Sequence, residues 1–265
     1  MPNPSISVVV PALNEAENLR FVLPAIPPDV HEVILVDGHS HDDTIRVALR
    51  LRPEIKIVVQ DGRGKGAALR SGFAAATGDI IVMLDADAST DPGEIPAFVH
   101  ALVTGADFAK GSRFLPGGGT SDMPLHRRLG NKGFVLLVRL LFGGRYTDLC
   151  YGYNAFWRRA LPALALDGDG FEIETMMNVR ALRAGLVVKE VPSFEAKRQY
   201  GEGRLRTIPD GWRVLRTIFS ERARRWPRWV EDLHVSSAVP IAILPPERVA
   251  VALEPAEQER MVSSR

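Results

Sequence analysis

The sequence predicts an α/β fold, with a single Rossmann-like, mostly parallel sheet flanked by helices. Two observations predict it. Short apolar runs rich in β-branched residues alternate with helical patterns through the first half of the chain. Acidic residues stand directly after several of these runs. A β-α-β-α order implies parallel strands joined by right-handed crossovers, and such sheets bind ligands at the carboxyl ends of their strands.

The expected elements of the first half follow in order. Strands are expected at 6–10, 32–36, 55–59 and 80–84, each a five-residue run with at least four apolar residues. Helices are expected between them. Asn14 is expected to cap the first helix with Glu17 three residues later, Asp42 and Asp43 start the second, and the third begins at Lys65.

The second half is less regular. Strands are expected at 107–111, 154–157 and 187–191, and helices at 125–142, 172–184 and 209–232. Residues 1–232 are expected to form one domain. Residues 233–265 mix Pro, Ala, Val and Glu without periodicity, which predicts a poorly ordered tail.

Composition narrows the possible functions. The chain has 265 residues, 46% of them hydrophobic and 25% charged, as in an ordinary globular protein. Its net charge is +1, so no nucleic-acid partner is expected. No apolar stretch reaches the roughly 18–20 residues needed to cross a bilayer. Together with the single cysteine, Cys150, and the lack of a visible signal sequence, this predicts a cytoplasmic protein.

Two carboxylates stand where the strand at 80–84 should leave the sheet. Asp85 and Asp87 are separated by one residue, so on an extended chain both side chains face one point. Like charges this close repel unless a cation lies between them, and Mg²⁺ prefers one or two carboxylates plus phosphate oxygens. Asp37 and Asp61 also fall at expected strand ends. The alternative is an acidic loop in which Asp87 and Asp91 cap the next helix.

Four segments together resemble family-2 glycosyltransferases, which have the GT-A fold. They are VPALNE at 10–15, VDGHSHDDT at 36–44, GKGAALRSGF at 64–73 and DAD at 85–87. Their order and spacing match the nucleotide-binding and metal motifs of that family over roughly residues 5–115. The resemblance implies the following donor-binding residues: Pro11, Ala12, Glu15, Asp37, Asp61, Lys65, Gly66, Asp85 and Ala86. It implies Mg²⁺ or Mn²⁺ held by Asp85, Asp87 and Ser89.

Later segments resemble one branch of the family, the synthases of polyprenyl-phosphate sugars of the dolichyl-phosphate mannose or glucose type. They are GSR at 111–113, RRLGN at 127–131 and RQYGEGRL at 198–205. Two departures stand out. Gly203 and Arg204 replace the usual Ser and Lys, and Cys150-Tyr151 stands where the branch usually has Thr-Ser.

The resemblance implies a metal-dependent, inverting transfer of a hexose from UDP-glucose or GDP-mannose to polyprenyl phosphate. A phosphate acceptor is already an anion and needs cations to bind it, for which Arg113, Arg127, Arg128 and Arg198 are candidates. A hydroxyl acceptor would need a base, either Glu172 or Glu174. The residues that would take part in catalysis are therefore Asp85, Asp87, Arg113, Arg198 and Glu172.

The segment 209–232 predicts an interfacial helix. Trp212, Leu215, Ile218 and Phe219 form an apolar stripe among many arginines, and Trp226 and Trp229 follow. A basic amphipathic helix with tryptophans is typical of a surface that lies on anionic lipid. We therefore expect a peripheral protein at the inner face of the membrane. The alternative is a helix packed on its own domain with solvated arginines.

Two other functions stay open. The same fold could glycosylate a hydroxyl of a small molecule or saccharide, or it could bind a nucleotide sugar without turnover. The donor base and the sugar are set by a few hydrogen bonds that the sequence does not reveal.

Overall fold

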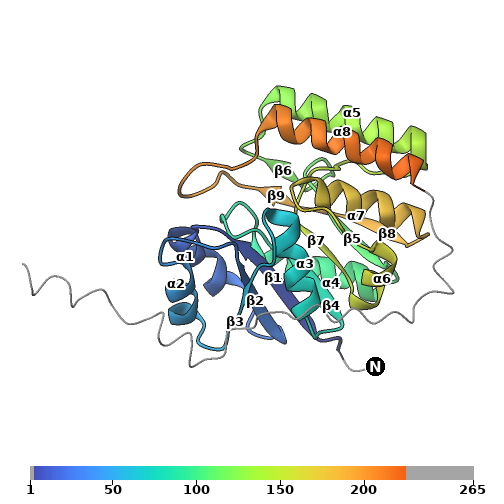
Figure 1. The fold of residues 1–265 in the computed structure, drawn as a ribbon. Helices are drawn as coiled ribbons and strands as arrows, with labels where there is room; N and C mark the ends of the chain where they lie inside the picture. The colour runs from blue at the N-terminus through green and yellow to red at the C-terminus, as the bar shows by residue number, and fades with distance from the viewer. Residues whose placement is uncertain (1–2, 225–265) are drawn as a thin grey trace, which may run out of the picture.

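A computed structural model describes residues 3–224, and all structural statements below concern that part of the chain. The expected tail at 233–265 and the end of the expected helix at 209–232 lie outside it. The large sheet has seven strands in the order β3-β2-β1-β4-β7-β5-β8 (Figure 1). Its strands are β1 Ile6–Ala12, β2 Glu32–Asp37, β3 Lys56–Val59, β4 Ile80–Met83, β5 Phe108–Ser112, β7 Asn154–Trp157 and β8 Val188–Pro192.

The sheet is mostly parallel, as predicted. Strands β1 to β4 pair in parallel, and β5 pairs in parallel with β8. Strand β7 alone runs antiparallel, between β4 and β5. Residues 8–10 of β1 and all of β4 are buried and apolar because helices cover both faces of the sheet. A separate two-stranded pair joins β6 Gly119–Thr120 to β9 Phe194–Glu195.

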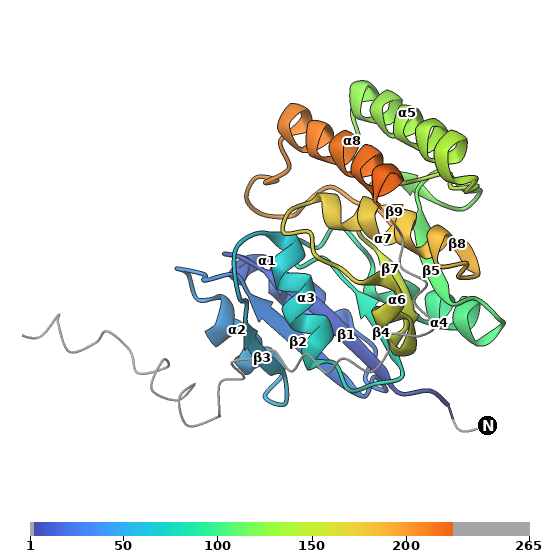
Figure 2. The same ribbon diagram turned by 45° about the vertical axis from the view of Figure 1, so that its right-hand side comes forward.

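Helices form layers on the two faces of the sheet (Figures 1 and 2). One core cluster packs helices α1, α2 and α4 on one face, and a second packs α3, α6 and α7 on the other. These helices are α1 Ala16–Ala25, α2 Thr44–Leu51, α3 Lys65–Ala75, α4 Ile95–Val103, α6 Leu161–Leu164 and α7 Glu172–Arg183. Short 3₁₀ turns at Pro92–Glu94 and Arg158–Ala160 precede α4 and α6.

A third layer lies on the outer side of α7. Helices α5 Leu125–Phe142 and α8 Thr207–Ala223 lie side by side there in both views (Figures 1 and 2). They share a core cluster with α7 that includes Val138, Val179, Val214 and Ile218. In the described residues, no helix is both long and apolar enough to cross a membrane.

The predicted capping of the first helix is wrong. Asn14 has a φ of 55°, in the left-handed region, and its side chain accepts a hydrogen bond from the His41 amide at 2.7 Å. The helix begins after Glu15, which makes no side-chain capping bond. Asn14 therefore joins two loops at the carboxyl edge of the sheet, because a contact distant in sequence replaces the local one.

Candidate functional site

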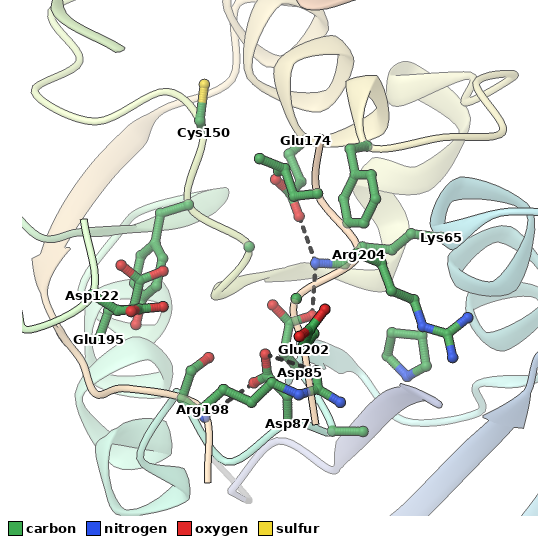
Figure 3. Close-up of a pocket in the computed structure, with 18 of the residues that line it drawn as sticks. Lys65, Asp85, Asp87, Asp122, Cys150, Glu174, Glu195, Arg198, Glu202 and Arg204 are labelled. Carbon is green, nitrogen blue, oxygen red and sulfur yellow. Dashed lines mark hydrogen bonds and ion pairs between the residues drawn. The ribbon is translucent and has the colours of Figure 1, made fainter. Parts of the chain in front are cut away.

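Asp85 and Asp87 lie where β4 ends, in the wall of a cavity of about 810 Å³ (Figure 3). The cavity opens at the carboxyl edge of the parallel strands, the position expected for a ligand site in such a sheet. Ala86 and Ser89 also line it, and the Ser89 amide donates to Asp87 Oδ1 at 3.0 Å. Asp91 caps the following 3₁₀ turn, as the alternative interpretation expected, whereas Asp87 faces the cavity.

Lys65 connects two acidic residues in this cavity. It is the first residue of α3, and its Nζ lies 2.6 Å from Asp85 Oδ1 and 2.7 Å from Glu174 Oε1 of α7 (Figure 3). Burial alone would lower the pKa of Lys65, but the charges of Asp85 and Glu174 outweigh it, so that the pKa is raised above its ordinary value. Lys65 is therefore a permanent cation beside the carboxylate pair.

Gly152 makes room for this arrangement. A Cβ atom at Gly152 would lie 2.8 Å from Asp85 Oδ2, from Glu174 Oε1 and from Lys65 Nζ. Real Cβ atoms do not approach other atoms this closely, so any larger residue would displace the three charged groups. Glycine at this position is a requirement of the site.

Arg198 links Glu15 to Asp87. Its Nη2 lies 2.6 Å from Glu15 Oε1, and its Nη1 lies 3.5 Å from Asp87 Oδ2. Glu15, which is buried, also accepts a hydrogen bond from Asn18 of α1. Arg198 comes from the loop after β9, so this ion pair closes that loop over the cavity.

Arg113 lines the cavity but is already neutralised. Its guanidinium donates to both carboxylate oxygens of Asp148, at 2.6 and 2.9 Å, and to Glu195 at 3.0 Å. Arg113 and Asp148 are both buried. The sequence placed Arg113 at an acceptor phosphate, whereas in the structure its charge is balanced by two acids. Its visible role is to hold the 148–152 loop against β9.

The residues expected at the donor divide into two groups. Pro11, Ala12, Glu15, Lys65 and the 85–87 segment line the cavity. Three others lie outside its lining: Asp37, Asp61 and Gly66.

The structure shows how Asp37, Asp61 and Gly66 are placed outside the cavity lining. Asp37 is buried and accepts a hydrogen bond from the Ser40 amide at 3.1 Å. The Gly66 amide donates to the carbonyl of Asp169 at 2.8 Å, and Asp61 is exposed.

Glu172 and Glu174, the two candidate bases, lie in different surroundings. Glu172 accepts a hydrogen bond from the Gly170 amide at 2.9 Å at the start of α7 and does not line the cavity. Glu174 lines it and bonds Lys65. Burial raises the pKa of Glu174, and Asp85 raises it further, while Lys65 opposes the change.

Several lining residues were missed by sequence reasoning. Gln60 directly follows β3, so the rule that placed Asp85 at a strand end would also have found it. His126, Phe171 and Lys197 were given no role in the site, since loops and helix ends from distant parts of the chain bring them to the cavity. Tyr151 and Arg204, which stand at the two departures from the branch motifs, also line it. Cys150 also lines it, and burial raises its thiol pKa to about 12.

Asp85 and Asp87 could bind a metal ion whose remaining ligands come from a substrate phosphate. Within the described residues, no group of three or more His, Cys, Asp or Glu side chains is placed to bind a metal ion. Asp85 and Asp87 supply two carboxylates on one wall, with the Ser89 hydroxyl nearby. Mg²⁺ is usually bound by one or two carboxylates plus phosphate oxygens and water. The residues present therefore fit the expected group.

The family assignment follows from comparison with known proteins. A family model described as "Glycosyl transferase family 2" matches residues 7–164, more than half of the chain. The chain belongs to glycosyltransferase family 2. The matched residues include the ends of β2, β3 and β4, with Asp37, Asp61 and the Asp85–Asp87 pair.

Relatives within the family include polyprenyl-phosphate sugar transferases by name. The chain is 32% identical over 212 residues to polyprenol monophosphomannose synthase of Mycolicibacterium smegmatis, covering 75% of this chain and 80% of that protein. It is 30% identical to dolichol-phosphate mannosyltransferase of Pyrococcus furiosus, covering 83% and 64%. Other curated relatives are longer still, and the chain spans 43% and 52% of two of them.

Solved structures confirm the GT-A fold. Glucosyl-3-phosphoglycerate synthase from Mycobacterium tuberculosis, solved with Mn²⁺, UDP and glucosyl-3-phosphoglycerate, superposes with a TM-score of 0.67 at 26% identity. The match covers 84% of this glycosyltransferase chain and 82% of the synthase.

Proposed function

We propose that this glycosyltransferase transfers a hexose from a nucleotide sugar to polyprenyl phosphate, with inversion at the anomeric carbon and with Mg²⁺ or Mn²⁺. The observation that carries the proposal is that one cavity holds both an Asp-x-Asp carboxylate pair and cations without a carboxylate partner. Asp85 and Asp87 line one part of it. Arg127 and Lys197 line another, and neither forms an ion pair with a described residue.

The donor side follows from the first group. The metal, when bound by Asp85 and Asp87, would neutralise charge that develops on the leaving diphosphate. Lys65 adds a permanent positive charge at the same wall. Pro11, Ala12 and Gln60 shape the part of the cavity nearest the ends of β1 and β3, where the nucleoside would lie.

The acceptor side follows from the second group. Arg127 stands in the first turn of α5, and His126 beside it also lines the cavity. An arginine offers two parallel N–H donors to a phosphate, so Arg127 can orient a phosphate monoester toward the sugar. That acceptor is already an anion, and its attack needs no strong base. Names of relatives support this class of acceptor.

A second acceptor class is favoured by Glu174. It is a buried carboxylate in the lining of the cavity, and burial raises its pKa above the ordinary value for a glutamate. One structural neighbour is named for its product, glucosyl-3-phosphoglycerate, in which the sugar is carried by a small molecule. A hydroxyl acceptor with Glu174 as base is therefore the competing function.

Incubation with radiolabelled donors separates the two. UDP-glucose and GDP-mannose are offered with polyprenyl phosphate and Mn²⁺, and the product is extracted into organic solvent. If the acceptor is polyprenyl phosphate, we expect label from one of the two donors in the organic phase. If the acceptor is a sugar or another small molecule, the label stays in the aqueous phase. Label that never leaves the aqueous phase would contradict a lipid acceptor.

A matched pair of variants tests the role of the carboxylates. Asp87→Asn is expected to lower transfer on the order of a hundredfold or more, because charge stabilisation by a metal is worth several kcal/mol. Asp29→Asn is the control, since Asp29 is exposed in the turn before β2, at the opposite edge of the sheet. Equal activity of the two variants would contradict the metal assignment.

A further inference from the structure

Helix α5 carries a row of exposed leucines. Leu125, Leu129, Leu136 and Leu140 are four, seven and four residues apart, a spacing that places them on one side of a helix. Their exposed fractions lie between 57% and 74%. The buried residues of the helix, Asn131 and Val138, lie on its other side. The row therefore faces away from the domain.

Helix α8 repeats this pattern. Ile208, Trp212 and Phe219 are four and seven residues apart, and their exposed fractions lie between 52% and 84%. The opposite side of α8 packs Val214 and Ile218 into the cluster shared with α5 and α7. The apolar stripe expected from the sequence is wrong in this respect, because Ile218 is buried whereas Trp212 and Phe219 are exposed. Because both helices pack on α7 through the sides opposite their exposed rows, the rows form one continuous surface. We call it the outer face of α5 and α8 (Figures 1 and 2).

The charges on the outer face are of one sign. On α5, Arg128, Lys132 and Arg139 are exposed beside the leucines, and the helix contains no acidic residue. On α8 three exposed arginines accompany the apolar row, Arg213, Arg216 and Arg222, of which Arg213 forms an ion pair with Asp210 at 3.2 Å. The acidic residues of α8, Asp210 and Glu221, are both buried.

The structure points to an anionic lipid bilayer as the partner of this face. Apolar side chains that include a tryptophan enter the boundary between headgroups and acyl chains, while arginines and lysines beside them attract anionic lipid. A second copy of the chain is disfavoured, because pairing the same face with itself would bring two cationic rows together. The inference of an anionic bilayer depends on both observations, because neither the apolar row nor the positive charge would indicate this partner by itself.

The orientation connects this surface to the site, and this step rests on the proposed function. Both helices begin at the cavity: His126 and Arg127 of α5 line it, as do Thr207, the first residue of α8, and Leu205 two residues before it. Docking through the outer face would place that part of the cavity at the level of the lipid headgroups. A phosphate on a membrane-held prenyl chain could then reach Arg127 without leaving the bilayer.

Vesicle binding without any donor tests the surface apart from the reaction. Full-length protein is sedimented with vesicles of phosphatidylcholine and phosphatidylglycerol. Leu136→Gln/Leu140→Gln is expected to lower the partition coefficient about tenfold or more, because two apolar side chains lose their burial in lipid. The control, Val103→Gln/Val187→Gln, changes two exposed valines on other elements and is expected to bind like the wild type.

The charge contribution is tested in the same assay. Lys132→Gln/Arg139→Gln is expected to weaken binding on the order of fivefold for each charge removed, and only when anionic lipid is present. Equal binding by the leucine variant and its control would overturn the inference. So would a dimer in solution that the leucine variant converts to a monomer, since the face would then pair with itself.

The outcomes for surface and reaction are separable. Transfer to a short, water-soluble prenyl phosphate is measured for the same variants and is expected to stay unchanged, because these side chains do not line the cavity. If the wild type transfers the sugar but does not bind vesicles, the docking inference is wrong and the proposed function stands. If it binds vesicles but transfers to no prenyl phosphate, the proposed function is wrong and the docking inference stands.

Discussion

The ammonium group of Lys65 lies 2.6 Å from Asp85 Oδ1, so a lysine pairs with a carboxylate that the sequence assigns to a metal. The same group lies 2.7 Å from Glu174. Lys65 thereby balances acids that would otherwise repel one another in a partly enclosed cavity. A divalent ion that binds Asp85 must compete with this ion pair or share the carboxylate with it.

Replacing Lys65 should strengthen metal binding and weaken transfer. In Lys65→Gln, Asp85 and Glu174 lose their shared cation, and we expect Mn²⁺ to bind the nucleotide-free protein about tenfold or more tightly, an ion-pair contribution of roughly 1.4 kcal/mol. Calorimetric titration with Mn²⁺ measures this. Lys65→Arg keeps the charge and serves as the control. Unchanged Mn²⁺ affinity in Lys65→Gln would show that the ion pair and the metal do not compete.

Gly152→Ala should damage the site and leave the fold intact. The new Cβ would meet the tips of Asp85, Glu174 and Lys65, which are flexible ends that can move away. We expect transfer to fall about tenfold to a hundredfold, since misplaced catalytic groups are costly, with a nearly unchanged melting temperature. Gly133→Ala is the matched control, because a Cβ there meets nothing within 4 Å. Full activity in Gly152→Ala would show that the three charged groups need not keep this arrangement.

The buried pair of Arg113 and Asp148 should be a major contribution to stability. Asp148→Asn removes one of the two acids that balance the buried Arg113, while Glu195 remains at 3.0 Å. We therefore expect a loss of about 2–3 kcal/mol, less than when a buried charge loses every partner. Urea unfolding at neutral pH measures the loss. The control is Asp43→Asn, which removes an exposed ion pair to Arg46 and should cost no more than about 1 kcal/mol. Similar losses in the two variants would contradict this account.

The same pair predicts a pH dependence. Burial raises the pKa of Asp148, but its hydrogen bonds and charge interaction with Arg113 outweigh this, so that the folded-state pKa is lowered. A lowered folded-state pKa stabilises the protein above the unfolded-state value, about 4, and this stabilisation is lost as the pH falls through the folded-state value. The difference in unfolding free energy between wild type and Asp148→Asn should therefore shrink as the pH is lowered below about 4.

Cys150 should resist alkylation although it lines the cavity. Burial raises its thiol pKa to about 12, and the thiolate is the reactive form. At pH 8 the native protein should react with iodoacetamide far more slowly than after unfolding in guanidinium, where the thiol returns to its ordinary pKa near 8.5. Mass spectrometry of the two samples measures the rates. Equal rates would show that Cys150 is an ordinary exposed thiol.

Much of the fold was readable from local patterns. The strands at 6–10, 32–36 and 80–84 and the helices at 125–142 and 172–184 all appear close to their expected bounds. Apolar runs and glycine stops are short-range signals, so each can be recognised without knowing its neighbours. The Asn14 cap failed because its side chain found a partner 27 residues away. A sequence window cannot contain such a partner.

The sequence by itself determined the parallel sheet, the acidic residues at its carboxyl edge and the basic, tryptophan-containing helix that became α8. Tertiary structure alone decided how these residues are paired. Lys65 meets a glutamate 109 positions later, and Arg113 is balanced by Asp148 and Glu195. It also set α5 beside α8, so that two apolar rows became one surface. The physical reason is that periodicity records which side of an element is buried, whereas the partner of a charged side chain depends on how distant elements pack.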